Sequence, residues 1–376
     1  MKVKFFTDQL KQFGIETLVG VPDSTLRPFC EYISTDGQNQ FRHYVAANEG
    51  GAIGIAAGDY LSTGKPACVY MQNSGIGNAV NPLTSIMNKD VYGIPALLLI
   101  GWRGEPGVHD EPQHIFMGKI TTDILKLLDI PYTIIDGKTN EEQLQTALGE
   151  AAKAIENKKQ YALIIKKNTF EAEFEVKHTN SNSLCRENVI REILRIIGKD
   201  DVIVSTTGKI SREVYEQSNA IWNQHSQDFL TVGGMGHAAM IAFGVAENMP
   251  HKRVFCLDGD GAVLMHMGNL PVIGKNAPSN FIHICLNNEA HESVGGIPTG
   301  AAGQSYAGLA LKSGYKNSFC INDEAELHQI LSQLSSMKGP AFLEILVSMD
   351  SRSDLGRPKE SAAENKEAFM KYHRGK

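Results

Sequence analysis

The chain has 376 residues, of which 42% are apolar, and its 36 basic and 42 acidic side chains leave a formal charge of −6. This composition is that of a globular protein with enough apolar material for two or three domains. The mild acidity excludes a protein that coats nucleic acid, because no basic surplus exists to displace counterions from phosphates.

The sequence also bears on membranes and compartment. The longest apolar run, 94–100, is far shorter than the roughly 20 residues of a membrane span. The N-terminal segment has no sustained apolar stretch, so we expect no signal peptide and no membrane partner. The six cysteines form no Cys-x-x-Cys pair, which excludes a zinc ribbon and fits reduced thiols in a cytoplasmic protein.

Short aliphatic runs alternate with helical patterns along the chain. Strands are predicted at 17–21, 67–71, 96–100, 132–135 and 162–165, and after a polar stretch at 202–205, 254–257, 281–286 and 341–347. This alternation predicts an α/β fold with two similar doubly wound parallel-sheet domains. We place the domains at 1–168 and 185–376, with a linker at 169–184. Ligands of such sheets bind at the carboxyl ends of the strands.

The most specific pattern is Gly259-Asp260-Gly261 directly after a buried strand, followed by Asn287-Asn288 after the next strand. A carboxylate and an amide oxygen at neighbouring strand ends suit Mg²⁺, and the glycines allow backbone N–H groups to approach a phosphate. The sequence therefore predicts a magnesium diphosphate site. The alternative is an ordinary turn in which Asp260 only caps a helix.

A second pattern lies in the first half of the chain, where Glu49 stands among small residues that open a predicted helix. Such a carboxylate can exchange a proton with a ligand, or it can simply complement the helix dipole. Further turns that follow predicted strands contain Asp23 and Ser24, and Gly75. We expect all of these residues at one edge of the first sheet, where they are candidate ligand-binding residues.

With these motifs the chain resembles the thiamine diphosphate-dependent decarboxylases over essentially its whole length. The resemblance implies a pyrimidine-binding first domain and a diphosphate-binding second domain. It also implies that Asp260, Asn288 and the backbone carbonyl of Ala290 bind Mg²⁺. Glu49 would contact the aminopyrimidine and relay the proton whose removal makes the cofactor a nucleophile. Ala262 departs from the family, which often has Ser there, so only its backbone N–H could serve the diphosphate.

The resemblance further implies a set of thiamine diphosphate contacts. Met235 would support the bent cofactor, although a methionine can also be core filler. The remaining contacts would come from Gly75, Thr207, Gly208, Gly234, Gly259, Gly261 and Ser293.

Most family members carry a third, central domain, and this chain has only a short linker in its place. In this respect it is similar to the short phosphonopyruvate and sulfopyruvate decarboxylases. Their substrates carry a second anion, which calls for arginine and lysine side chains. Arg103, Arg357 and Lys359, together with Asp23 and Ser24, are the candidate substrate residues, with ordinary surface charge as the alternative for the cations. His114 and His291 are candidate proton donors, although a single histidine can equally be structural.

The resemblance implies the conversion of 3-phosphonopyruvate to phosphonoacetaldehyde and carbon dioxide through the thiamine diphosphate ylid, in the biosynthesis of 2-aminoethylphosphonate. It also implies self-association, with each active site between the Glu49 domain of one subunit and the Asp260 domain of another. Two alternatives remain: a sulfopyruvate decarboxylase, which differs in the distal anion, and a non-enzymatic receptor for a small anion.

Overall fold

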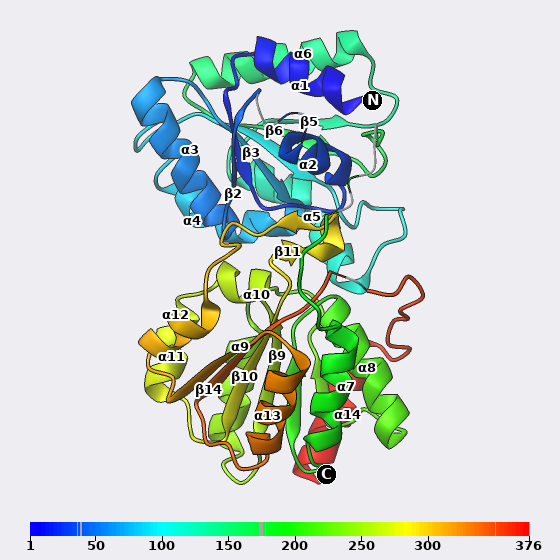
Figure 1. Ribbon diagram of the computed structural model, residues 1–376. Helices are drawn as coiled ribbons and strands as arrows, with labels where there is room; N and C mark the ends of the chain where they lie inside the picture. Colours follow the sequence, from blue (N-terminus) through cyan, green and yellow to red (C-terminus); the bar gives the residue numbers. More distant parts are fainter. Residues whose placement is uncertain (36, 38–39, 173–175, 177, 350, 376) are drawn as a thin grey trace. The chain divides into compact units, whose positions relative to one another are not determined.

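The computed structural model describes residues 1–35, 37, 40–172, 176, 178–349 and 351–375 (Figure 1). The chain forms two compact units, residues 1–177 and 178–376, and the boundary falls within the segment that the sequence analysis assigns to a linker. Each unit contains a six-stranded parallel sheet with helices on both faces, which confirms the predicted fold class.

The first unit is built on a sheet of order β2-β1-β3-β4-β6-β5. Its strands are β1 (Thr17–Gly20), β2 (Arg42–Val45), β3 (Cys68–Gln72), β4 (Leu97–Gly101), β5 (Tyr132–Ile135) and β6 (Tyr161–Ile165). Its helices are α1 (Val3–Gln12), α2 (Arg27–Ser34), α3 (Glu49–Thr63), η1 (Asn73–Gly75), α4 (Ile76–Thr84), α5 (Pro112–Leu127) and α6 (Glu141–Glu156).

The faces of this sheet are covered by different helices. Helices α3, α4 and α5 pack against one face in a continuous apolar core, and the ring of Phe29 in α2 contacts Tyr70 of β3 on the other. Every residue of the central strands β1 and β4 is buried. Their lack of polar alternation is typical of parallel strands covered on both sides.

The second unit is built on a sheet of order β13-β14-β10-β9-β7-β8. Its strands are β7 (Val202–Ser205), β8 (Asp228–Leu230), β9 (Val254–Gly259), β10 (Phe281–Asn287), β13 (Asn317–Ile321) and β14 (Ala341–Leu346), and a separate antiparallel pair is formed by β11 (Ala290–His291) and β12 (Ile297–Pro298). Its helices are α7 (Arg186–Ile196), α8 (Lys209–Trp222), α9 (Ala238–Asn248), α10 (Asp260–Met265), α11 (Asn269–Asn276), η2 (Glu292–Val294), α12 (Tyr306–Lys312), α13 (Glu324–Leu334) and α14 (Ala362–Arg374).

Two apolar cores hold this unit together, one on each face of its sheet. One core contains side chains of α7, α8 and α13, and the other contains side chains of α9, α11 and α12. Alternate residues of each strand point to opposite cores, so that Ile203 joins the first core and Val202 and Val204 the second.

Candidate active site

Both units collect their candidate residues at the carboxyl edge of their sheet, where ligands of doubly wound folds bind. In the first unit these residues follow β1, β2, β3 and β4, and in the second unit most of them follow β7, β8, β9 and β10.

Glu49 is the first residue of α3 and is 5% exposed. The helix begins there because the side chain of Asn48 caps it, accepting a hydrogen bond from the backbone N–H of Gly51 at 2.8 Å. The side-chain amide of Asn78 in α4 donates to Glu49 Oε2 at 2.7 Å. Gly75 lies against the other side of the carboxyl group, where an added Cβ atom would stand 2.3 Å from Oε1. The carboxylate is thus held in one orientation between two neighbouring turns.

A second group in the first unit joins the turn after β1 to the turn after β4. Asp23 is 1% exposed, and its Oδ2 accepts hydrogen bonds from the backbone N–H groups of Thr25 and Leu26 at 2.9 and 3.2 Å. Its Oδ1 is buried without a hydrogen-bond partner among the described residues. Burial raises the pKa of Asp23 to about 6, even though Arg103 and the two N–H groups act in the opposite direction.

Arg103 connects this group to the loop before α5. Its Nη1 donates to Ser24 Oγ at 2.7 Å, and its Nε donates to Asp110 Oδ2 at 2.8 Å while Nη2 binds Oδ1 of the same carboxylate. Burial opposes ionisation of Asp110, but the hydrogen bonds from Arg103 and the Gly104 N–H prevail and lower its pKa to about 2. The structure therefore brings Asp23, Ser24 and Arg103 together, and it adds Asp110 to them.

His114 lies near Arg103 and Asp110, in the first turn of α5. Its imidazole is half-buried, and burial together with the charge of Arg103 lowers its pKa to about 4. Near neutral pH the ring is consequently uncharged.

Asp260 has a buried carboxyl group at the carboxyl edge of the second sheet, directly after β9. It begins α10, is 3% exposed, and its Oδ2 is buried with no hydrogen-bond partner among the described residues. Burial raises the pKa of Asp260 to about 7 against hydrogen bonds from backbone N–H groups, including that of Asn288 directly after β10. A buried oxygen without a partner costs free energy unless an ion or a ligand binds it.

The turn after β10 places the other two predicted metal ligands beside Asp260. Asn288 Oδ1 accepts a hydrogen bond from the backbone N–H of Ala290 at 3.2 Å, and both residues are buried. Glu289 between them has a φ of +61°, a conformation that is uncommon for a residue other than glycine. Asp260 Oδ2, which has no partner among the described residues, thus lies beside the turn that contains the Asn288 and Ala290 oxygens.

Gly261, Met235 and His291 meet next to the same turn. A Cβ atom on Gly261 would stand 3.2 Å from both the methyl group of Met235 and Cε1 of His291. The segment that contains Met235 is a run of turns in which Gly233, Gly234 and Gly236 all have positive φ. Burial lowers the pKa of His291 to about 4, and its Nε2 has no hydrogen-bond partner within the described part of the chain.

Thr207 and Gly208 lie at the end of β7, in the turn that begins α8. Thr207 Oγ1 accepts a hydrogen bond from the N–H of Gly233 at 3.0 Å, which links this turn to the Met235 segment. The adjacent Lys209 donates to Glu292 Oε1 at 3.0 Å, and Asn288 donates to Oε2 of the same carboxylate at 3.1 Å. The buried Arg186 also binds Glu292, so η2, with its exposed Ser293, is anchored to two cations.

The remaining candidates lie in other positions. Gly259 ends β9 and Ala262 is buried in α10. Arg357 and Lys359 are exposed on the segment after β14, which is held against α8: the N–H groups of Gly356 and Lys359 donate to Glu216 and to the Tyr215 hydroxyl. These two cations are placed beside α8 rather than in the group around Asp260.

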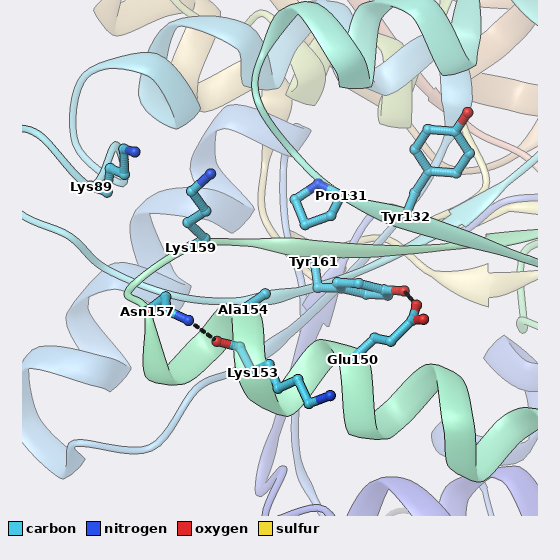
Figure 2. A pocket seen from close by; sticks show the side chains of 9 residues that line it. All are labelled: Lys89, Pro131, Tyr132, Glu150, Lys153, Ala154, Asn157, Lys159 and Tyr161. Carbon is cyan, nitrogen blue, oxygen red and sulfur yellow. Dashed lines mark hydrogen bonds between the residues drawn. The ribbon is translucent and has the colours of Figure 1, made fainter.

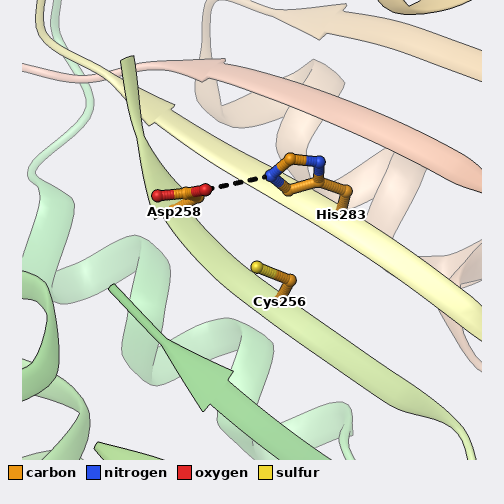
Figure 3. A group of neighbouring side chains, drawn as sticks. All are labelled: Cys256, Asp258 and His283. Carbon is orange, nitrogen blue, oxygen red and sulfur yellow. Dashed lines mark hydrogen bonds and ion pairs between the residues drawn. The ribbon is translucent and has the colours of Figure 1, made fainter. Parts of the chain in front are cut away.

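Below the Asp260 turn, three side chains of β9 and β10 come close enough to share a metal ion: Cys256, Asp258 and His283 (Figure 3). Asp258 and His283 already have protein partners, however. His283 Nε2 lies 3.3 Å from Asp258 Oδ2 and Nδ1 lies 3.1 Å from the Tyr315 hydroxyl, while Asp258 Oδ1 accepts from the Gly259 N–H at 3.0 Å. We therefore interpret this cluster as a hydrogen-bonded support for the turn that carries Asp260.

A surface pocket of about 540 Å³ is separate from these groups (Figure 2). It lies at the beginning of β5 and β6, the opposite edge of the first sheet from Glu49. Its lysines include Lys159, which pairs with Asp129 at 2.5 Å, and the hydroxyl of Tyr161 donates to Glu150 at 2.7 Å. Because it lies at the opposite edge of the sheet, we do not assign this pocket to the candidate active site.

Several residues of the site were not predicted as site residues. Asn78, Asp110, Lys209 and Glu292 act through contacts with residues that were predicted. The local signal was membership of a predicted turn or segment: Asn78 follows Gly75, Lys209 follows Gly208, and Asp110 and Glu292 belong to the polar segments that contain His114 and His291.

Comparisons with known proteins agree with the division into two units. Residues 3–127 match the family described as thiamine pyrophosphate enzyme, N-terminal TPP binding domain, and residues 207–345 match its C-terminal TPP binding domain. Helices long and apolar enough to cross a membrane are absent from the described residues.

Similar proteins cover nearly the whole chain. The phosphonopyruvate decarboxylase of Streptomyces viridochromogenes is 33% identical over 381 residues, covering 96% of this chain and 92% of the relative. That of Streptomyces hygroscopicus is 30% identical over 380 residues with the same coverage. The sulfopyruvate decarboxylase of Methanosarcina acetivorans is 26% identical over 358 residues, covering 90% of this chain and 89% of the relative.

Proposed function

The chain belongs to the phosphonopyruvate decarboxylases within the family of thiamine pyrophosphate-dependent decarboxylases, and on this premise we propose that it cleaves 3-phosphonopyruvate into phosphonoacetaldehyde and carbon dioxide. The sulfopyruvate decarboxylase is a more distant relative, which favours the phosphonate over the sulfonate as substrate. When bound, thiamine diphosphate supplies a carbon nucleophile for the ketone and takes up the electron pair that the departing carboxylate leaves.

The single observation that carries this proposal is the buried oxygen of Asp260 that no described residue binds. A divalent cation there would stabilise the carboxylate that burial otherwise disfavours. Asn288 Oδ1 and the Ala290 carbonyl supply neutral oxygen ligands beside it. Oxygen ligands of this kind suit Mg²⁺, which keeps further positions for water and diphosphate oxygens.

The residues around this turn fit a diphosphate. Gly259 and Gly261 flank Asp260, and a Cβ atom at Gly261 would crowd Met235 and His291, so glycine lets these two side chains pack directly against the backbone of the turn. Thr207 and Gly208 lie in a neighbouring turn, in which Thr207 Oγ1 accepts a hydrogen bond from the Gly233 N–H. In this proposal the N–H groups of these turns and of Ala262 bind the diphosphate, Gly234 and Ser293 line it, and Met235 contacts the rings.

In the first unit, Glu49 is proposed to hold and move a proton at its carboxyl oxygen. Its Oε2 is engaged by Asn78, and Gly75 allows the carboxyl group to lie against the backbone of η1. Fixed in this way, the carboxyl group can hydrogen-bond a ring nitrogen of the cofactor without rearranging, which favours proton exchange.

Substrate recognition is proposed for the Asp23, Ser24 and Arg103 group. The fork of Arg103 is oriented by Asp110, and one N–H on each terminal nitrogen stays available for a phosphonate oxygen. Asp23, with a pKa of about 6, can hold the proton that the product carbon needs. His114 and His291 are uncharged near pH 7 and are proposed as hydrogen-bonding groups. Arg357 and Lys359 are proposed to approach the substrate from the segment beside α8.

We also propose self-association, with each active site formed by the Glu49 unit of one subunit and the Asp260 unit of another. This proposal rests on family membership. Mixing an inactive Glu49→Gln protein with an inactive Asp260→Ala protein tests it, because mixed oligomers would contain some sites in which both residues are intact. Recovery of activity on mixing is expected, and no recovery despite subunit exchange would contradict it.

The cofactor requirement has a direct test. Protein treated with a chelator and dialysed should release no carbon dioxide from phosphonopyruvate until both thiamine diphosphate and Mg²⁺ are added back. Full activity of the stripped protein, or restoration by either component alone, would contradict the proposal.

A further inference from the structure

A buried glutamate next to the edge strand of the second sheet is not among the residues proposed to contact the cofactor or the substrate. Glu344 lies in β14 and is 1% exposed. Its Oε1 accepts a hydrogen bond from the side-chain amide of Asn287 at 2.8 Å, and its Oε2 accepts one from the backbone N–H of Ala307 in α12, also at 2.8 Å. Cys320, opposite it in β13, places a thiol beside the same carboxyl group.

These three partners are uncharged, so the hydrogen bonds alone offset the desolvation of the carboxyl group. Replacing buried polar networks by apolar side chains is often neutral or stabilising, and stability alone therefore gives a weak reason for a glutamate at this position. The contact with Asn287 suggests a different reason.

Asn287 is the last residue of β10, and its side chain reaches the turn that carries the proposed metal ligands. Its Oδ1 accepts a hydrogen bond from the backbone N–H of Glu289 at 2.9 Å. Glu289 has a φ of +61° and is held on its other side by the N–H of Thr299, which donates to the Glu289 carbonyl at 2.9 Å. The turn is therefore fixed in a left-handed conformation that a non-glycine residue rarely adopts unaided.

The orientation of the Asn287 amide follows from the chemistry of its two neighbours. Both carboxyl oxygens of Glu344 accept hydrogen bonds, and the backbone N–H of Glu289 can only donate one. The amide NH₂ must therefore face Glu344, and the amide oxygen must face Glu289. Without an acceptor at position 344, only the Glu289 N–H would orient the amide, and the buried NH₂ group would lose its partner.

We infer that Glu344 is a positioning residue for the magnesium site: through Asn287 it holds the Asn288-Glu289-Ala290 turn in the conformation that presents the Asn288 and Ala290 oxygens beside Asp260. This inference rests on the proposed function, because it assumes that the turn binds the cation. Glu344 itself contacts neither the cation nor the cofactor in this arrangement.

A polarity exchange between the two residues tests the inference. In Glu344→Gln an amide replaces one acceptor, so an NH₂ group meets either Asn287 or the Ala307 N–H. In Asn287→Asp two carboxylates face each other in a buried place. In the double variant the amide oxygen at position 344 can accept from the Ala307 N–H, while the new NH₂ group donates to the carboxylate at position 287. That carboxylate still accepts from the Glu289 N–H, and the double variant keeps the net charge of the wild type.

The primary measurement is calorimetric titration of each stripped protein with thiamine diphosphate at fixed Mg²⁺, and with Mg²⁺ at fixed thiamine diphosphate. Each single variant should bind about 10- to 100-fold more weakly, as is usual when a residue that orients a metal ligand is lost. The double variant should return to within about threefold of the wild type, because the two changes are coupled. The kcat at saturating Mg²⁺ and cofactor should stay close to that of the wild type.

Controls separate positioning from general damage. Cys285→Ala removes a buried side chain that pairs with Glu344 in the β-sheet register, and it should bind cofactor like the wild type. Circular dichroism melting of each apoprotein ensures that binding is measured below its unfolding temperature. If Glu344→Gln does not fold, the double variant alone decides the question.

Three results would overturn the inference: wild-type affinity in Glu344→Gln, a double variant that binds no better than the weaker single variant, or an equal loss in Cys285→Ala. Asp260→Ala in the same titrations distinguishes failure of the inference from failure of the proposed function. Loss of binding in Asp260→Ala with normal binding in Glu344→Gln would refute only the positioning role. Normal binding in Asp260→Ala would refute the metal site itself.

Discussion

Gly75 lies so close to Glu49 that a Cβ atom at position 75 would stand 2.3 Å from Oε1 and 2.5 Å from Cδ of the glutamate. Gly75→Ala must therefore push the Glu49 carboxyl group out of its place. We expect this variant to fold and to lose most of its decarboxylase activity. Gly77→Ala is a matched control two residues further on, because its Cβ would meet no atom within 4 Å. Equal activity of the two variants would show that the position of Glu49 does not matter.

Glu49→Gln tests the proton relay itself. Glutamine keeps the shape of the side chain and an acceptor for Asn78, so cofactor binding should weaken only modestly. Because it cannot exchange the proton, turnover should fall by roughly 10²- to 10⁴-fold. Hydrogen–deuterium exchange at the reactive ring carbon of bound thiamine diphosphate measures this step directly. Exchange as fast as in the wild type would mean that Glu49 serves only as a charge at the start of α3.

Asp23→Asn should increase stability while it reduces turnover. Burial raises the pKa of Asp23 to about 6 in the folded chain, whereas the unfolded chain releases this proton near pH 4, about the ordinary value. The folded state therefore binds more protons between these values, and the free energy of unfolding decreases as the pH rises through them. Removing the carboxyl group should restore up to about 3 kcal/mol above pH 6 and nothing below pH 4.

Denaturant unfolding of wild type and Asp23→Asn across pH 3.5 to 8 checks this prediction. Asp8→Asn, which removes an exposed carboxylate that pairs with Lys4, is the control. A difference in stability between wild type and Asp23→Asn that stays constant over the whole range would contradict the raised pKa.

Arg103→Lys tests anion recognition. Lysine keeps the charge but cannot bridge Ser24 and both oxygens of Asp110 as the guanidinium does. We expect kcat/KM for phosphonopyruvate to fall about 10- to 100-fold, the loss of one or two charge-assisted hydrogen bonds. The slow turnover of pyruvate should change less. Arg42→Lys, which changes an exposed arginine paired with Asp59, is the matched control, and an equal loss on both substrates would remove Arg103 from anion recognition.

Most of the sheet architecture was predictable because the central strands are continuous apolar runs. The predicted strand at 132–135 has the same bounds as β5, and that at 281–286 is one residue shorter than β10. Strands β2, β8 and β13 were not predicted; each is an edge strand that pairs with only one neighbour. Their alternating or partly exposed side chains, as in the Arg42–Val45 strand, give no apolar run to detect.

The site was predictable where a local pattern reflects a local requirement. Asp260 stands between glycines, and Asn288 follows directly after a strand, so both could be recognised from their neighbours. The contacts that orient the site join residues distant in the chain. Asn78 reaches Glu49 across 29 residues and Glu344 reaches Asn287 across 57, so neither side chain has a signal in its own segment.

The measurement that tests the central claim most directly is a steady-state comparison of phosphonopyruvate, sulfopyruvate and pyruvate, with thiamine diphosphate and Mg²⁺ present and carbon dioxide as the common product. The account predicts that kcat/KM is highest for phosphonopyruvate, exceeding that for pyruvate by at least about tenfold, because pyruvate leaves a cationic group without its charge-assisted bonds. Equal turnover of pyruvate, or a preference for sulfopyruvate, would contradict it.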